Sequence, residues 1–246
     1  MYTDKNYWQN YYHNINVDKN QIISICSKYD KYWDILFKAC KHDPKSILEV
    51  GAYPGRFIAY VASKYQLKPT ALDFIPDSTK IERSFKEMGV SDYEIITDDI
   101  NSHIPGRKYD LIISLGFIEH FEDYKSVLNK HADMLEDGGA ILIIIPNKRG
   151  LRKLYGFLCD KKNLEAHNLK CMNKKTFKEF SINNNLKVHL LTYYGSFQYG
   201  VHQKLNYFQL FIYHFVRLLS IKFKPYIEKY PSWIYSAGII AIYSKE

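Results

Sequence analysis

The stretch Ile47-Leu48-Glu49-Val50-Gly51-Ala52-Tyr53-Pro54-Gly55 decides the fold. It is a short apolar strand that runs into a turn containing glycine and proline, and a helix is expected to follow at residues 57–65. Gly51 allows the backbone to turn sharply, and Gly55 allows it to approach a ligand closely. Because ligands of parallel α/β sheets bind beyond the carboxyl ends of the strands, this turn is a candidate binding loop.

An acidic residue at the end of the next expected strand supports this interpretation. Asp73 follows Gly51 by roughly 20 residues, where a carboxylate can accept hydrogen bonds from both hydroxyls of a ribose. A dinucleotide-binding loop is the main competitor, but Tyr53 and Arg56 stand where its fingerprint requires glycine. The other alternative is a plain strand–turn–helix whose glycines are incidental.

Strands and helices alternate after residue 45. The expected strands are 46–50, 69–74, 93–97, 109–114, 140–145, 186–193 and 237–243. The expected helices are 57–65, 78–88, 124–135 and 174–183. Wholly apolar strands between helices indicate a parallel sheet that is covered on both faces. Residues 147–175 are expected to form a basic connection rich in loops.

The chain divides into four expected parts. Residues 1–45 carry aromatic and aliphatic residues at helical spacing and predict an N-terminal helical cap. Residues 46–195 form the α/β core, and residues 232–246 return to it as a final strand. Residues 196–231 are an apolar insertion, for which a lid over the active site, a homodimer interface and a membrane-surface helix are all open.

A series of motifs in a fixed order resembles the class I S-adenosylmethionine-dependent methyltransferases. The motifs are Glu49–Gly55, Asp73, Asp98–Ile100, Tyr109–Ser114, Phe117–His120 and Leu135–Pro146. The resemblance covers about residues 45–195 and the last strand. It implies an α/β, Rossmann-like, doubly wound sheet of seven strands with an antiparallel last strand, and S-adenosyl-L-methionine as the cofactor.

The resemblance also implies roles for the residues of the first motif. Glu49 would contact the methionine end of the cofactor through solvent or backbone. Gly51, Ala52, Tyr53 and Gly55 would shape the loop. The family often has another glycine at the position of Ala52 or Tyr53, and its absence leaves Tyr53 able to cover the cofactor.

The remaining cofactor contacts come from later motifs. Asp73 would hold the ribose, with Phe74 beside the adenine. Asp99 would bind the adenine amino group and Ile100 its face, with Asp98 as the alternative to Asp99.

Two histidines are candidate general bases on the acceptor side. His120 follows the expected strand 109–114, next to Leu115 and Gly116, which the resemblance places beside the methionine carboxylate and the methyl group. His167 lies in the connection after residue 146, where this fold often binds its substrate. A capping role for His120 and a surface position for His167 remain the alternatives. No metal is expected, because Gly116 stands where metal-binding relatives have an acidic residue.

The charge of the chain limits its partners without selecting one. The net charge is +8 and the isoelectric point about 9.0, which suits nucleic acid, an anionic membrane surface or a phosphate-bearing small molecule. The basic connection 147–175 favours a diphosphate, as in a nucleotide-linked sugar, because lysine and arginine pair with phosphate oxygens. Nucleic-acid bases are not expected acceptors, because the chain has no Asn-Pro-Pro-Tyr-type signature.

The four cysteines form no CxxC pair, so a reducing compartment is expected. The first 20 residues have no apolar signal core, and the longest apolar stretch, residues 210–221, is too short to span a bilayer. These features predict a cytoplasmic protein without a transmembrane segment.

The leading hypothesis is O-methylation of a sugar hydroxyl in surface-polysaccharide biosynthesis, with a histidine as general base. N-methylation of a small amine and O-methylation of a quinone-like ring are the alternatives among enzymes. A non-catalytic, cofactor-binding protein associated with nucleic acid is the alternative outside enzymes.

Overall fold

Seven strands form one sheet in the computed structural model, which describes residues 2–12 and 15–246. The strands are β1 (Ser46–Val50), β2 (Lys68–Asp73), β3 (Glu94–Thr97), β4 (Tyr109–Leu115), β5 (Leu135–Pro146), β6 (Leu186–Tyr194) and β7 (Gly238–Lys245). Their order is β3-β2-β1-β4-β5-β7-β6, and β7 runs antiparallel to both of its neighbours. This confirms the predicted doubly wound sheet with its reversed last strand.

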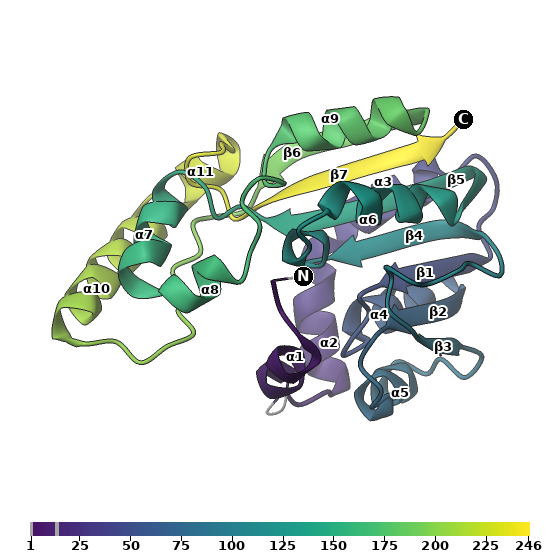
Figure 1. Ribbon diagram of the computed structural model, residues 1–246, viewed down its shortest axis with the longest axis horizontal. Helices are drawn as coiled ribbons and strands as arrows, with labels where there is room; N and C mark the ends of the chain where they lie inside the picture. The colour runs from purple at the N-terminus through teal and green to yellow at the C-terminus, as the bar shows by residue number, and fades with distance from the viewer. Residues whose placement is uncertain (1, 13–14) are drawn as a thin grey trace.

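Helices cover both faces of this sheet (Figure 1). One face carries α2 (Lys19–Cys26), α3 (Asp30–Ala39), α4 (Arg56–Tyr65) and α5 (Thr79–Glu87), and the other carries α6 (Tyr124–Asp133) and α9 (Lys174–Asn183). Successive strand residues point to opposite faces, so Ile47 joins the first core cluster and Leu48 the second. The sheet is therefore apolar on both sides, as its continuous hydrophobic strands predicted.

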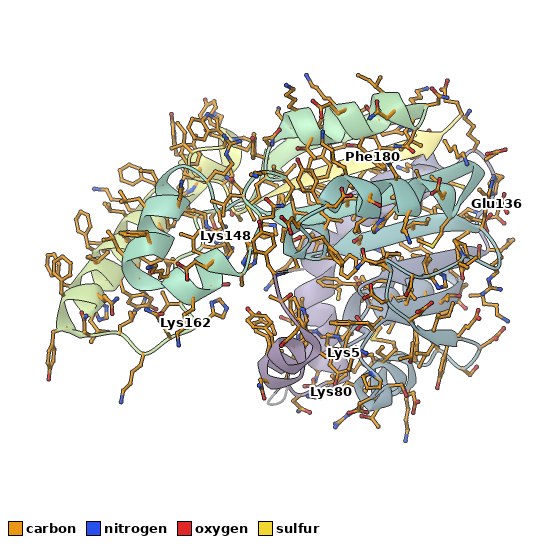
Figure 2. The ribbon with its side chains drawn as sticks, viewed as in Figure 1. Lys5, Lys80, Glu136, Lys148, Lys162 and Phe180 are labelled. Carbon is orange, nitrogen blue, oxygen red and sulfur yellow. The ribbon has the colours of Figure 1, made fainter. Side chains whose placement is uncertain are left out.

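A helical lobe lies beyond the carboxyl ends of the parallel strands (Figure 1). It comprises α7 (Leu151–Cys159), α8 (Lys161–Glu165), α10 (Tyr207–Lys222) and α11 (Lys224–Lys229). Figure 2 shows Lys148, which follows β5, where the lobe meets the sheet, and Glu136 near the start of β5 at the other end of the sheet. None of the helices in the described part of the chain is long and apolar enough to cross a membrane.

Two expectations about the connections were wrong. Residues 147–175 contain α7 and α8, where loops were expected. The basic residues of α7 obscure an apolar periodicity at Leu151, Leu154, Tyr155 and Leu158, which has the spacing of a helix face.

The boundary between α6 and β5 also differs from the prediction. The helix ends at Asp133, and the strand already begins at Leu135. Leu135 pairs with Tyr109, and the register then shifts so that Ala140 pairs with Leu111. The Asp-Gly-Gly turn is thus an irregularity within the strand and not a separate connection.

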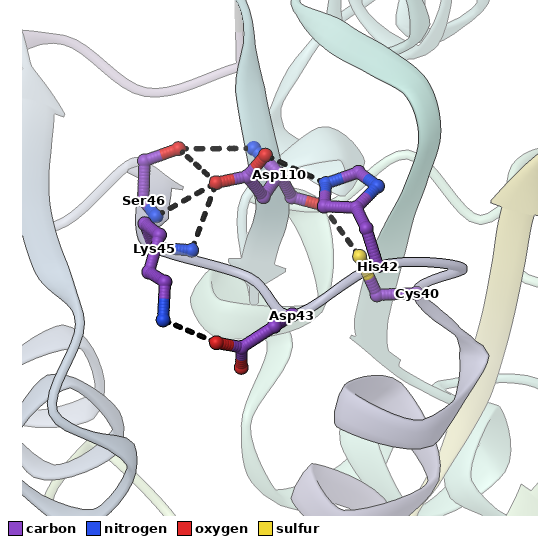
Figure 3. Close-up of polar contacts among 6 residues, drawn as sticks. All are labelled: Cys40, His42, Asp43, Lys45, Ser46 and Asp110. Carbon is purple, nitrogen blue, oxygen red and sulfur yellow. Dashed lines mark hydrogen bonds and ion pairs between the residues drawn. The ribbon is translucent and has the colours of Figure 1, made fainter.

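A half-buried carboxylate joins three segments at the amino-terminal edge of the sheet (Figure 3). Asp110 Oδ2 accepts hydrogen bonds from Lys45 N (2.9 Å), Ser46 N (2.9 Å) and Ser46 Oγ (2.8 Å), and Oδ1 lies 2.8 Å from His42 Nε2. Burial would raise the pKa of this carboxyl, but these hydrogen bonds outweigh it and lower the pKa to about 2. The charged form therefore fastens the start of β1 to β4.

Replacing Asp110 by Asn is expected to lower the free energy of unfolding by about 1–3 kcal/mol, because the donors of Lys45 and Ser46 lose a charged acceptor. The pKa is depressed in the folded state, so this stabilisation is present at neutral pH and is lost as the pH falls from about 5 towards 2. Urea unfolding of both proteins over this range should show the difference narrowing with acid. A difference that stays constant with pH would contradict the charged form as the source.

Candidate cofactor and methyl-acceptor site

The loop after β1 is held in a conformation that needs glycine. Gly51 has φ +76°, Gly55 has φ +88°, and Gly51 N and Ala52 N both donate to Leu72 O on the neighbouring strand. A Cβ atom on Gly51 would lie 2.2 Å from Cδ2 of Phe117, so the ring covers the loop directly. Both predicted glycines are therefore required by the backbone.

The Glu49 carboxylate has a partner within the protein. The side chain is buried, and its Oε2 accepts a hydrogen bond from Ile58 N in the first turn of α4 at 3.0 Å. Burial raises the pKa of Glu49 well above its ordinary value. This contact fastens the helix start behind the loop, a role that the sequence did not predict.

A hollow of about 260 Å³ lies beyond the ends of β1, β2 and β4. Its lining residues are Val50, Gly51, Leu72, Asp73, Phe74, Asp98, Asp99, Ile100, Phe117 and Phe121. The lining thus brings together Gly51, Asp73, Phe74, Asp98, Asp99 and Ile100 from the predicted cofactor residues.

Other predicted residues lie outside this lining. They do not line the hollow: Glu49, Ala52, Tyr53 and Gly55 belong to the end of β1 and its loop, and Leu115 and Gly116 lie at the end of β4. Sequence reasoning missed Phe117 and Phe121 as wall residues. Their signal was available, since both are aromatic residues just after the end of a buried strand.

Asp73 ties the hollow to the loop. Its Oδ2 accepts from Tyr53 N at 2.9 Å and its Oδ1 from Ile75 N at 3.0 Å. Burial raises the pKa of Asp73, and these backbone donors oppose that rise. Each carboxylate oxygen has a second lone pair, so the side chain can still accept hydrogen bonds from a ligand.

The two acidic residues after β3 differ in their partners. Asp98 Oδ2 lies 2.9 Å from His103 Nδ1, and this hydrogen bond lowers the pKa of Asp98. Asp99 Oδ1 accepts from Asn101 N and Asn101 Nδ2 at 2.9 and 3.0 Å. Both carboxylates line the hollow beside Ile100.

Helix α1 (Lys5–Tyr12) packs its aromatic residues over the binding loop. The Tyr12 ring lies 5.3 Å from the Tyr53 ring, and Lys5 Nζ lies 5.7 Å from the centre of Phe74. Trp8 packs edge-on against His120, with ring centres 4.7 Å apart. The N-terminal segment thereby connects the cofactor side of the site with the acceptor side.

The two predicted histidines meet beside a buried carboxyl. The rings of His120 and His167 are 4.6 Å apart, and Glu119 Oε1 lies 3.8 Å from His120 Nε2. The backbone carbonyls of Ala166 and Asn163 accept from His120 Nδ1 (2.9 Å) and His167 Nδ1 (2.6 Å). Both Nε2 atoms are then left with a free lone pair.

Burial controls the protonation of this cluster. Burial lowers the pKa of His120 to about 4. Burial and the nearby charges of Lys148 and His120 lower the pKa of His167 to about 2. Burial raises the pKa of Glu119 to about 8, and Glu119 Oε2 has no hydrogen-bond partner within the described residues. At neutral pH both imidazoles are therefore neutral and able to accept a proton.

Lys148 lies beside the cluster and lines a second hollow. The side chain is buried, its Nζ donates to Asn163 O at 3.4 Å, and burial lowers its pKa to about 8. The second hollow, of about 300 Å³, is lined by Lys148, Arg152, Tyr155, Gly156, Asp160, Asn163, Leu164, Gln198 and Gly200. Lys148 remains mostly charged at neutral pH and has spare donors for an anion.

Only part of the basic connection 147–175 reaches this hollow. Arg152 lines it, but its Nη1 donates to the carbonyls of Asn147 and Ala237 and supports the backbone. Arg149 instead lies over the Trp233 ring. Of the basic residues in this connection, Lys148 and Arg152 line the second hollow, and the Lys148 ammonium is the less engaged of the two.

Glu119, His120 and His167 have ligand atoms within 4.8 Å of one another and could in principle hold a metal ion. The neighbouring Lys148 ammonium interacts electrostatically with His120 and His167. A fixed positive charge at this place disfavours a divalent cation.

The first hollow has the chemistry that S-adenosylmethionine requires. Carboxylates at Asp73 and Asp99 suit ribose hydroxyls and an adenine amino group, while Phe74 and Ile100 supply apolar contact for a base. The aromatic rings of Tyr12 and Tyr53 suit a sulfonium cation at the loop. The residues present therefore fit this cofactor.

Comparison with known proteins agrees with this geometry. Residues 24–209 match the family model of a methyltransferase domain. (S)-coclaurine N-methyltransferase from Thalictrum flavum subsp. glaucum is 27% identical over 103 residues, which are 41% of this chain and 28% of that protein. The chain therefore matches less than a third of that relative's length.

Solved structures share the fold at low sequence identity. Coclaurine N-methyltransferase bound to N-methylheliamine and S-adenosylhomocysteine aligns with a TM-score of 0.57 at 14% identity, covering 89% of this chain and 72% of that one. A methyltransferase dependent on S-adenosylmethionine from Archaeoglobus fulgidus aligns with a TM-score of 0.59 at 17% identity, covering 98% and 100%. The chain belongs to the class I S-adenosylmethionine-dependent methyltransferases.

Proposed function

We propose that this methyltransferase methylates a hydroxyl of a small polar acceptor that carries an anionic group, most specifically a nucleotide-linked sugar used for surface polysaccharide. The observation that carries the proposal is the neutral His120–His167 pair beside a buried, charged Lys148. This arrangement combines a proton acceptor with an anion-binding cation at one place.

The cofactor residues follow from the first hollow. Asp73 would accept hydrogen bonds from the ribose, Asp99 from the adenine amino group, and Phe74 and Ile100 would contact the base. S-adenosylmethionine supplies a methyl group on a positively charged sulfur and leaves as S-adenosylhomocysteine. The protein contributes alignment of the acceptor with that methyl group, which is worth roughly 7–11 kcal/mol in favourable cases.

His120 is the proposed general base. Its Nδ1 is held by Ala166 O, so Nε2 faces the space shared with Glu119 and His167. The acceptor hydroxyl proton would pass to Nε2 as its oxygen takes the methyl group. A positioned base of this kind contributes about 10²–10⁴ in rate.

Lys148 is the proposed anion contact. Its ammonium lines the second hollow next to the histidines, and no carboxylate within the described residues forms an ion pair with it. Phosphate oxygens would give this buried cation the partners it lacks. The second hollow is therefore the proposed place of the acceptor.

N-methylation of a small amine is the second candidate. It is favoured by the curated relatives, which include (S)-coclaurine N-methyltransferase and ajmaline N-methyltransferase. A buried Glu119 whose pKa is raised could receive a proton from an ammonium at mildly alkaline pH. An activity assay distinguishes O-methylation of a sugar from N-methylation of an amine. It measures formation of S-adenosylhomocysteine from S-adenosylmethionine with a panel of nucleotide sugars and with a panel of small amines. Turnover with amines alone would reject the sugar proposal.

Replacing Asp73 by Asn is expected to weaken binding of S-adenosylhomocysteine by about 10-fold or more, because hydrogen bonds to a charged acceptor contribute about 1.5–3 kcal/mol. Isothermal titration calorimetry measures this. Glu136→Gln is the matched control, since Glu136 is exposed at the far end of the sheet (Figure 2). Equal affinities of the two variants would remove Asp73 from the cofactor site.

Replacing His120 by Gln is expected to lower kcat by about 10²-fold or more and to leave affinity for S-adenosylhomocysteine unchanged. Glu119→Gln should retain most of the turnover at pH 7, because glutamine mimics the protonated carboxyl that burial favours. If Glu119→Gln loses the turnover and His120→Gln keeps it, the carboxylate is the base.

The pH dependence of the wild-type enzyme gives a separate check on His120. The base must be neutral, and its pKa is lowered to about 4. Turnover should therefore stay constant as the pH is lowered from about 7 to 5, and fall below that as His120 gains a proton. A fall centred near the ordinary histidine pKa of about 6.5 would argue against this buried residue as the base.

Replacing Lys148 by Met is expected to raise KM for a phosphate-bearing acceptor by about 10-fold or more, because the acceptor loses a charge-assisted hydrogen bond. Affinity for S-adenosylhomocysteine should not change. Lys162→Met, on the exposed side of α8, serves as the control (Figure 2). An unchanged KM for Lys148→Met would place the anion elsewhere.

A further inference from the structure

Helix α10 presents large apolar side chains to the outside of the protein. Phe208, Phe211, Phe215 and Leu218 lie at spacings of three and four residues and therefore share one face, here called the outer face. They are 67%, 71%, 55% and 65% exposed. Ordinary surface helices place such residues inward, so this face needs an explanation.

The opposite face of α10 already has its partners. Ile212 and Val216 pack against a small core formed by Tyr155, Cys159 and Phe197. The helix start is also fixed, since Gln209 donates to Leu158 O on α7 at 2.8 Å. The outer face is therefore additional apolar surface and not a misplaced core face.

The exposed apolar surface extends over the rest of the lobe. Further exposed members are Leu151, Leu154 and Phe157 on α7, Tyr207 and Ile221 on α10, and Phe223, Tyr226, Tyr230 and Trp233 in and around α11. Figure 1 shows these helices together at the end of the molecule away from the sheet. Exposed apolar residues outside the lobe, such as Ile104 and Ile182, lie on other parts of the fold.

The same segment is strongly basic. Between residues 196 and 235 the cations are Lys204, Arg217, Lys222, Lys224 and Lys229, and Glu228 is the sole acidic residue of that stretch. All five cations are exposed. Lys222 and Lys229 lie over the rings of Phe223 and Tyr230, so their apolar stems follow the aromatic surface while the charge stays at its rim.

We propose that this lobe binds the surface of an anionic lipid bilayer, with α10 lying in the plane of the interface. Aromatic and aliphatic residues on one face with lysine and arginine at the rim are the features of an interfacial helix. Anionic headgroups provide the charge that the rim complements. A second copy of this chain is a poorer occupant, because pairing two such lobes would bring five cations of each copy together with Glu228 as the sole acidic residue of residues 196–235 to oppose them.

The dimensions of the helix agree with this arrangement. The 16 residues of α10 form a helix about 24 Å long, and none of the described helices is long and apolar enough to cross a membrane. Tyr226, Tyr230 and Trp233 have the amphipathic rings that favour the headgroup level. The proposal does not depend on the acceptor or on the proposed chemistry of the site.

Sedimentation of the full-length chain with lipid vesicles tests this proposal. Binding is expected with vesicles of phosphatidylcholine and phosphatidylglycerol in equal amounts, and is expected to be much weaker with phosphatidylcholine alone. Raising the salt from about 50 mM to about 500 mM should weaken it, because exposed charges are screened. Equal binding to both vesicle types, or none to either, would overturn the proposal.

A double variant tests whether the outer face of α10 is the surface that contacts the vesicle. Phe211→Ser with Phe215→Ser should weaken vesicle binding by about 10-fold or more, since each buried Phe side chain contributes about 1.5–3 kcal/mol. Ile182→Ser is the control, because Ile182 is 74% exposed on α9 and lies outside the lobe. Unchanged affinity for S-adenosylhomocysteine shows that each variant is folded.

The charged rim is tested in the same way. Lys222→Gln, Lys224→Gln and Lys229→Gln combined should abolish the preference for anionic vesicles, whereas Lys175→Gln on α9 should not. Light scattering of the lipid-free protein tests the alternative occupant, a second copy of this chain, because it measures whether the protein is a monomer or a dimer. A dimer that Phe211→Ser and Phe215→Ser convert to a monomer, without vesicle binding by the wild type, would assign this face to self-association and reject the membrane.

Discussion

The attachment of the loop after β1 to the end of β2 is the contact on which the rest of the site depends. Gly51 N and Ala52 N donate to Leu72 O, and Tyr53 N donates to the carboxylate of Asp73. These bonds turn the chain at the edge of the sheet, so that α4 starts behind the loop and the hollow opens in front of it. Left-handed glycines make the turn possible without strain.

Burial determines the chemistry on the acceptor side. His120 and His167 arrive from segments far apart in the chain, and backbone carbonyls fix which nitrogen of each ring carries the proton. The same desolvation that keeps both rings neutral raises the pKa of Glu119 and lowers that of Lys148. Burial thus places a neutral proton acceptor, His120, close to Lys148, a cation with few hydrogen-bond partners.

The lobe gives this enzyme two different surfaces. One side of the lobe lines the second hollow together with Lys148. Its outer side carries exposed aromatic residues with a basic rim, which suit a lipid surface. Small-molecule chemistry and attachment to a membrane would then take place on opposite sides of the same few helices.

The sequence by itself determined the strands of the sheet and the loop after β1, because strand periodicity, turn glycines and the strand-end carboxylate of Asp73 are local signals. The reversed last strand followed from the ordered motifs that resemble the methyltransferase family. It predicted both His120 and His167 as separate candidates. Tertiary structure alone decided that they meet, that Lys148 is the cation beside them, and that Phe117 covers Gly51. Those relations depend on contacts between segments distant in the chain, and no local pattern encodes them. The two helices within residues 147–175 were missed for a related reason. Their stability comes from packing within the lobe, while their composition is that of a basic loop.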